Sequence, residues 1–380
     1  MDFNHSEEQQ MLQDTVARLV RDHYGFEQRQ RHYRSESGFS GEFWRRMGEL
    51  GLLGVPFAEV HGGFGGSGVD NLLVMTELGR GLCLEPYLSS QIFAGGLLQQ
   101  LGSAEQHERL LPPLIGGELQ LATAFEEPQS RYRLHEVRTR AVPAEGGWVL
   151  SGRKAVVIGG HSAGMLLVSA RTGGEAGDED GVSLFLVDAQ ADGLRRRAYP
   201  TVDGPKGCEL YLERTFVPEC DLLGEPGQAL AALRYQQGRA IAAQCAEAVG
   251  SMEEACRLTL DYLKTRRQFG TPIGKFQALQ HRMVDMRTEL ELATSMAILA
   301  ACVADEPDGE ERSRRLAAAK FIVVRAGRFI AEQAIQLHGG IGMTWEYVLA
   351  HHAKRLVMLG HQLGDDDHHL RVYAGLLRCA

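Results

Sequence analysis

The chain has 380 residues, of which 44% are hydrophobic, 23% charged and 7% aromatic, and its formal net charge is −9 at pH 7. This composition is typical of a folded globular protein with two or three domains and excludes disordered and fibrous classes. The negative charge argues against a general affinity for nucleic acid or anionic lipid. Seven cysteines without a C-x-x-C pair indicate a reducing compartment rather than a disulfide framework or a zinc site.

The first twenty residues give no sign of export. They lack a basic segment followed by an apolar run, and their acidic residues are unlike a mitochondrial transit peptide. No apolar stretch approaches the length that spans a membrane. We therefore expect a cytoplasmic protein that does not bind membranes.

Hydrophobic periodicity divides the chain into three parts. Residues 1–117 predict an α-helical domain, whose first helix begins with Ser6 and Gln9 in a capping box. Residues 118–225 contain short β-type runs separated by Gly, Asp and Pro, which predict a β-domain. Residues 226–380 return to long helical patterns and predict a helix bundle. The sequence contains no internal repeat, so it does not support a solenoid.

Two local patterns have simpler explanations than ligand binding. "GFGGSG" at 63–68 fits G-x-G-x-x-G, but that motif binds a dinucleotide only between a strand and a helix, and Pro56 interrupts the preceding segment. We predict a loop there. "DDDHH" at 365–369 has residue types that bind metals, but neighbouring residues on a helix point in different directions. We expect a solvated segment and no metal site.

Glu247 lies within "RAIAAQCAEAVGSM", residues 239–252, which otherwise suits close helix packing. A carboxylate kept from water must be paired, held protonated at a cost, or used in chemistry. Helical spacing places small residues on the same face as Glu247, and these would leave room for a ligand. Periodicity alone supports a ligand-facing glutamate and an ordinary exposed glutamate about equally.

Two segments in the last third are more specific. "RRQFGTPIGKFQALQHRMVDM" at 266–286 places Arg, Phe and Gly in a tight turn between long helices, and "QLHGGIGMTWEY" at 336–347 closes a helix with a double glycine. In this order and spacing they resemble the acyl-CoA dehydrogenase family over almost the whole chain. The resemblance implies an α+β fold: an N-terminal helical domain, a central β-barrel-like domain and a C-terminal four-helix bundle.

The resemblance also implies FAD bound at a subunit interface. The first turn would reach the FAD pyrophosphate of a neighbouring subunit, where a guanidinium fork suits phosphate. The second would let its backbone approach the adenosine part closely, because glycines carry no side chain. The residues that match these two turns are Arg266, Gln268 and Phe269, and Gln336, Gly339, Gly340 and Gly342.

The β-domain departs from the family pattern at the flavin. In "FEEPQSRYR", Glu126 after Phe125 replaces the threonine that would bond the flavin pyrimidine. "VVI" at 156–158 replaces a W-I-T or W-I-S segment whose hydroxyl faces flavin N5. Backbone groups can still serve the flavin, because their hydrogen bonds do not depend on side-chain identity. We expect flavin contacts from Phe125, Glu126, Val157 and Ile158.

Family members remove a proton next to a thioester carbonyl while hydride leaves the β-carbon for flavin N5, which gives a trans-2-enoyl-CoA. Burial of the glutamate base raises its pKa toward the operating pH. In better-known members this base follows the double glycine, at a place that falls on Gly364 here. Other branches carry it on the first long helix of the bundle, so the resemblance favours Glu247, with Asp365 as runner-up. Arg239 is a candidate contact for an anionic substrate group, or one half of a surface ion pair.

The same segments resemble the small subunits of two-component bacterial acyl-CoA dehydrogenases for pimeloyl-CoA or steroid side-chain CoA thioesters. This implies a homotetramer, or an α2β2 heterotetramer with a second acyl-CoA dehydrogenase chain, and an electron-transfer flavoprotein as electron acceptor. Two alternatives remain open. The chain is a catalytically silent or flavin-poor partner subunit, or it is an acyl-CoA oxidase.

Overall fold

The computed structural model describes residues 5–378, and its first third is helical. Ser6 caps the first helix as predicted: Gln9 N donates to Ser6 Oγ at 3.1 Å, and Ser6 N donates to Gln9 Oε1 at 3.2 Å. A π-helical segment, Leu88–Ala94, precedes the fifth α-helix. The α-helices of this part are α1 (Glu7–His23), α2 (Phe26–Arg34), α3 (Gly41–Glu49), α4 (Gly68–Arg80), α5 (Gly95–Leu101) and α6 (Ala104–Gly116).

The middle of the chain forms a mixed eight-stranded sheet. The strand order is β6-β7-β3-β2-β4-β5-β8, and β1 pairs in parallel with β4. All seven residues of β4 except the first are buried, as are the first six of β5, so these strands carry the core of the domain. The strands are β1 (Leu121–Ala124), β2 (Arg140–Ala144), β3 (Gly147–Lys154), β4 (Met165–Arg171), β5 (Val182–Asp188), β6 (Leu194–Pro200), β7 (Lys206–Pro218) and β8 (Leu222–Leu223).

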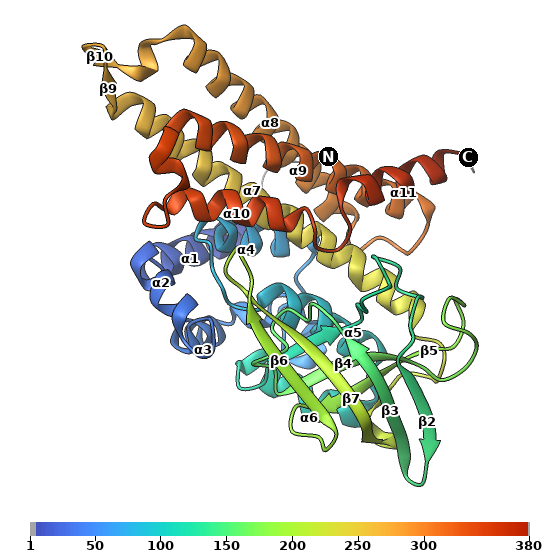
Figure 1. Ribbon diagram of the computed structural model, residues 1–380. Helices are drawn as coiled ribbons and strands as arrows, with labels where there is room; N and C mark the ends of the chain where they lie inside the picture. Colours follow the sequence, from blue (N-terminus) through green and yellow to red (C-terminus); the bar gives the residue numbers. More distant parts are fainter. Residues whose placement is uncertain (1–4, 379–380) are drawn as a thin grey trace.

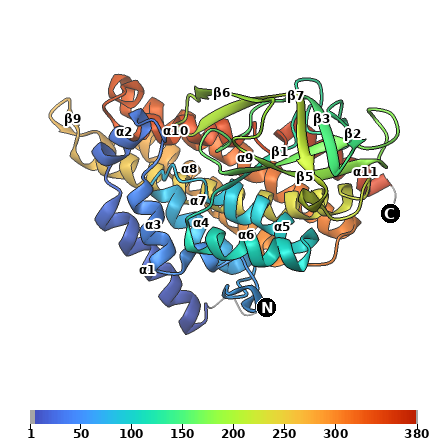
Figure 2. The ribbon, with the colours of Figure 1, turned by 90° about the horizontal axis from the view of Figure 1, so that it is seen from below.

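The last third is a bundle of long helices. Figure 1 shows α7 running from the β9–β10 hairpin at one end of the bundle to the sheet domain at the other. In Figure 2 the amino-terminal helices lie along one side of the molecule and the strands along the opposite side. The elements are α7 (Leu230–Thr265), β9 (Arg267–Gln268), β10 (Thr271–Pro272), α8 (Gln277–Val303), α9 (Glu310–His338), the 3-10 turn Gly339–Met343, α10 (Val348–Leu359) and α11 (Asp366–Arg378).

The small residues around Glu247 bring two helices together. A Cβ on Gly250 would lie 1.9 Å from the carbonyl oxygen of Thr76, and a Cβ on Gly79 would lie 2.1 Å from that of Glu247. Helices α4 and α7 therefore cross at backbone contact. The expectation that these small residues leave room for a ligand is wrong along this crossing, because α4 fills the space. An exposed Glu247 is also wrong, since residues 239–252 are buried throughout.

The sequence predicted a loop at residues 63–68 and a solvated segment at 365–369, and the structure agrees with the first of these predictions but only in part with the second. Residues 63–67 form a loop that leads into α4, whose first turn is capped by Ser67, as predicted. The expectation of a solvated segment at 365–369 is wrong in part, because His369 is buried and its Nε2 lies 2.9 Å from the carbonyl oxygen of Leu363. Within residues 5–378 no group of three or more His, Cys, Asp or Glu side chains could hold a metal ion. None of the described helices has the length and apolar character to cross a membrane.

Candidate active site

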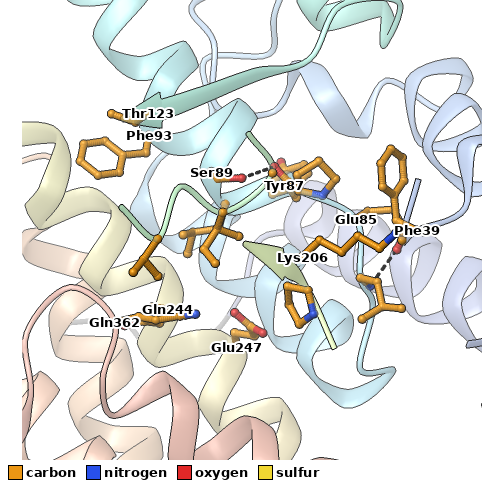
Figure 3. A pocket seen from close by; sticks show the side chains of 18 of the residues that line it. Phe39, Glu85, Tyr87, Ser89, Phe93, Thr123, Lys206, Gln244, Glu247 and Gln362 are labelled. Carbon is orange, nitrogen blue, oxygen red and sulfur yellow. Dashed lines mark hydrogen bonds between the residues drawn. The ribbon is translucent and has the colours of Figure 1, made fainter. Parts of the chain in front are cut away.

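A cavity of about 1200 Å³, including the part open to solvent, lies where the sheet domain meets α4, α7 and the turn between α10 and α11. Figure 3 shows polar side chains on its walls among aromatic ones. Three carboxyl groups line it: Glu85, Glu126 and Glu247. Its position at the meeting of the three parts makes it the candidate active site.

Glu247 is only 7% exposed, and its carboxylate is paired. Arg355, on α10, donates from Nε to Glu247 Oε1 at 2.6 Å and from Nη2 to Oε2 at 2.9 Å. The remaining Nη1 donates to Asp203 Oδ2 at 2.7 Å, and Asp203 is fully buried. A two-point contact with a guanidinium stabilises the ionised carboxylate. Of the three possibilities that the sequence left for a buried Glu247, the structure therefore shows the paired carboxylate.

The other two cavity carboxyls have different surroundings. Burial raises the pKa of Glu85 to about 7, although backbone N–H groups of Ser40 and Leu84 donate to it at 2.9 and 3.1 Å. Burial also raises the pKa of Glu126 to about 7. Within the described residues, the Glu126 carboxyl has no hydrogen-bond or ion-pair partner. Glu126 is thus a carboxyl without a protein partner on a cavity wall.

The β-domain edge offers further groups to a ligand. Phe125, Glu126 and Ile158 line the cavity, whereas Val157 does not: it is 2% exposed in the sheet core, and its N–H donates to Cys208 O at 2.9 Å. The carbonyl oxygen of Val157 in turn accepts from the N–H of Cys208 at 3.0 Å, so the structure does not support the expected flavin contact from Val157. Thr123 Oγ1 is buried beside the cavity without a partner in the described chain. Unsatisfied polar atoms at this edge fit a ligand rich in hydrogen-bonding heteroatoms.

The two glycine-containing turns meet at the far end of the bundle. Tyr262, at the end of α7, stacks on His338, at the end of α9, with ring centroids 4.4 Å apart. Gly339 and Gly340 are exposed, and a Cβ on either would meet nothing within 4 Å. The sequence motifs therefore form one exposed surface that does not line the cavity. Its other exposed members are Arg266, Gln268, Phe269 and Gln336.

Arg239 and Asp365 lie outside the cavity. Arg239 Nε pairs with Asp305 Oδ1 at 2.9 Å on a separate shallow depression, because eight helical residues turn it about 80° away from Glu247. Asp365 accepts the backbone N–H of His368 at 2.7 Å, so it caps the start of α11. Of the two alternatives for Arg239, the structure shows the ion pair and not a place on the cavity wall. Asp365 does not line the cavity either, which argues against it as a replacement for Glu247.

Sequence reasoning missed four residues at the site: Arg355, Asp203, Lys320 and Gln362. Lys320 is buried and donates to Gln244, which lines the cavity together with Gln362. None belongs to a recognisable motif. The available signal was a pair of cations, Lys320 and Arg355, on otherwise apolar faces of bundle helices. Such cations need buried partners.

Comparison with known proteins identifies the family. Three family models match in chain order: the N-terminal domain of acyl-CoA dehydrogenase at residues 6–118, the middle domain at 122–215 and the C-terminal domain at 227–374. The probable acyl-CoA dehydrogenase YngJ of Bacillus subtilis (strain 168) is 30% identical over 352 residues, which are 91% of this chain and 92% of that protein. The chain belongs to the acyl-CoA dehydrogenase family.

Two solved structures are similar to this acyl-CoA dehydrogenase over almost its whole length. A variant of the Tcur3481-Tcur3483 steroid ACAD is 30% identical, with a TM-score of 0.87 over 98% of both chains. The ChsE4-ChsE5 complex from Mycobacterium tuberculosis is 25% identical, with a TM-score of 0.89 over 100% of both chains. The predicted fold of helical, sheet and helical parts is confirmed. As a family member the chain is a flavoprotein oxidoreductase, and its cofactor is FAD.

The residues present fit FAD in two separate places. The buried, unpartnered Thr123 Oγ1 and the Glu126 carboxyl provide groups for a flavin ring at the cavity. The open surface at Gly339 and Gly340 lets another molecule approach the backbone, but it lies at the opposite end of α7 from the sheet domain. The roles of the individual residues toward FAD stay predictions.

Proposed function

We propose that this acyl-CoA dehydrogenase oxidises an acyl-CoA thioester between its α- and β-carbons, with Glu247 taking the α-proton. The observation that carries the proposal is that Arg355 holds Glu247 as a carboxylate on the cavity wall. A base must be deprotonated before it acts, and burial raises the pKa of Glu85 and Glu126 to about 7, so each is protonated in about half of the molecules at neutral pH. FAD, when bound, accepts the hydride from the β-carbon.

The ion pair with Arg355 engages both carboxylate oxygens of Glu247. We infer that the thioester displaces the guanidinium from Glu247 when it fills the cavity, so that a carboxylate oxygen can face the α-carbon. Asp203 supports this step, because it retains the guanidinium through Nη1 while Nε and Nη2 release Glu247.

The test compares Glu247→Gln with two control variants, Glu85→Gln on another wall of the cavity and Asp365→Asn in the turn before α11. We expect Glu247→Gln to lower kcat by about 10²–10⁴-fold, the usual contribution of a positioned base, with flavin content and assembly unchanged. The two control variants should keep turnover within the same order of magnitude. Turnover retained by Glu247→Gln would remove this assignment.

A second candidate, a catalytically silent partner subunit, has its own support. The bidentate pair with Arg355 also suits a purely structural Glu247, and Glu126 and the "VVI" segment depart from the family's flavin contacts. Expression of the chain alone separates the two. A yellow protein that oxidises acyl-CoA supports the catalytic proposal, whereas a colourless soluble protein that gains flavin only with a second chain supports the silent subunit.

The assembly and the electron acceptor belong to the same proposal. The exposed surface at Gly339 and Gly340 cannot reach the cavity of its own chain, which supports FAD shared between subunits in a homotetramer or an α2β2 heterotetramer. We place an electron-transfer flavoprotein as acceptor and a pimeloyl or steroid side-chain thioester as substrate class. Reoxidation by air at a rate equal to that by electron-transfer flavoprotein would instead indicate an oxidase.

A further inference from the structure

Lys320 is a buried cation that no ion pair neutralises among the described residues. It lies on α9, is 2% exposed, and donates to the backbone oxygen of Leu359 at 2.8 Å and to Oε1 of Gln244. Burial lowers the pKa of Lys320 to about 8, so it remains mostly protonated at neutral pH. Moving a charged ammonium group out of water costs free energy, so its hydrogen bonds within the protein deserve an explanation.

The contacts of Lys320 fix the direction of two glutamine side chains. An ammonium group only donates, so the atom of Gln244 that faces Lys320 must be its oxygen. The amide nitrogen of Gln244 then points the other way and donates to Gln362 Oε1 at 3.1 Å. That contact in turn requires the nitrogen of Gln362 to point away from Gln244. Within the described residues this nitrogen donates to nothing, and Gln362 lines the cavity.

This donor lies near the proposed base. Gln244 precedes Glu247 by three residues, so both occupy one face of α7. Figure 3 shows Gln244, Gln362 and Glu247 along the same side of the cavity. Loss of an α-proton drives negative charge onto the thioester oxygen, and donors fixed in advance stabilise such charge most effectively.

Resting on the proposed function, we propose that the carboxamide of Gln362 donates a hydrogen bond to the thioester carbonyl of the bound acyl-CoA. Gln362 touches the reacting group. Lys320 is a positioning residue that acts through Gln244, because it excludes the opposite orientation of both amides. A reversed Gln362 would present its oxygen to the developing negative charge and oppose the reaction.

The test measures binding rather than turnover alone. The FAD-loaded native assembly is titrated calorimetrically with pimeloyl-CoA, from the proposed substrate class, and with S-(6-carboxyhexyl)-CoA, the matching thioether that lacks the thioester carbonyl. We expect the wild type to bind the thioester about 3- to 10-fold more tightly, the effect of one neutral hydrogen bond. Gln362→Glu has the same shape and still accepts from Gln244 but cannot donate, so it should abolish or invert this preference and lower kcat about 100-fold.

Lys320→Met should also abolish the preference for the thioester. The double variant Lys320→Met/Gln362→Leu should lose no more thioester affinity than Gln362→Leu alone. If Lys320→Met does not fold, Gln244→Glu keeps an acceptor for Lys320 but cannot donate to Gln362, and it should give the same result. The matched control is Gln236→Leu, a buried glutamine of α7 that pairs with Gln100 away from the cavity. It should keep the preference.

Three outcomes decide the matter. A preference for the thioester that survives in Gln362→Leu overturns the role of Gln362. If Gln362→Leu loses the preference but Lys320→Met and Gln244→Glu both keep it, Lys320 does not orient Gln362 through Gln244. Binding of neither probe by the wild type contradicts the proposed function itself, and this failure differs from the other two because the wild type shows it.

Discussion

Arg355 and Glu247 form a two-point ion pair, with N–O distances of 2.6 and 2.9 Å, that joins α10 to α7 beside the cavity. Burial by itself lowers the pKa of Arg355, but Glu247 and Asp203 raise it above its ordinary value. The guanidinium of Arg355 therefore forms ion pairs with two carboxylates, those of Glu247 and Asp203. The placement of the Glu247 carboxylate on the cavity wall depends on this guanidinium.

Replacing Arg355 should destabilise the protein. Arg355→Gln leaves two buried carboxylates, Glu247 and Asp203, without their cation, which typically costs about 3–5 kcal/mol of stability. A denaturant titration measures this loss. Stability equal to that of the wild type would contradict the ion pair that joins α7 to α10.

Glu126 should make FAD binding depend on pH. Its pKa of about 7, raised by burial, means that it becomes charged as the pH rises from 6 to 8. If it faces the carbonyl oxygens of the flavin pyrimidine, the charged form repels them, so the Kd for FAD should increase over this range. Glu126→Thr should bind FAD more tightly and without this dependence.

The control for Glu126 is Glu85→Gln, because burial raises the pKa of Glu85 to about 7 on another wall of the same cavity. Fluorescence titrations of FAD at several pH values provide the measurement. A pH dependence removed by Glu85→Gln and kept by Glu126→Thr would show that the wrong carboxyl has been placed at the flavin.

Gly340→Ala should weaken FAD binding without affecting the fold. A Cβ on Gly340 meets nothing within 4 Å of this chain, so the melting temperature should stay unchanged. If cofactor or a second subunit lies against this backbone, the added methyl group should raise the Kd for FAD on the order of tenfold, about 1.4 kcal/mol. Gly309→Ala, equally open, serves as the control. Equal FAD affinity in both variants would contradict the prediction that FAD approaches the backbone closely at the double glycine.

Gly250→Ala should destabilise the protein, because its Cβ would lie 1.9 Å from the backbone oxygen of Thr76. Neither helix backbone can move away freely, and overpacking of this kind costs about 1–3 kcal/mol. Gly375→Ala is the contrasting change: it lies on α11 with nothing within 4 Å, and alanine favours a helix by about 1 kcal/mol over glycine. Chemical denaturation should show opposite signs for the two variants. Equal stability would mean that α4 and α7 do not cross in contact.

Much of the fold could be predicted because its signals are local. Capping of α1 by Ser6 and Gln9 depends on residues three apart, and the change from helical to β-type periodicity is visible within short windows. The double glycine at 339–340 indicated a helix end for the same reason. The sequence also singled out Glu247 as a carboxylate that required an explanation.

Only the tertiary structure decided what surrounds Glu247. Its partner Arg355 lies 108 residues further along the chain, and the orientation of Gln362 depends on Lys320 through Gln244. No local pattern encodes such contacts, because they arise from the angle and closeness at which helices cross. Sequence by itself therefore determined the family, the succession of helical and sheet parts, and the buried carboxylate. Tertiary packing determined that this carboxylate is paired with a cation and that an oriented amide shares its cavity.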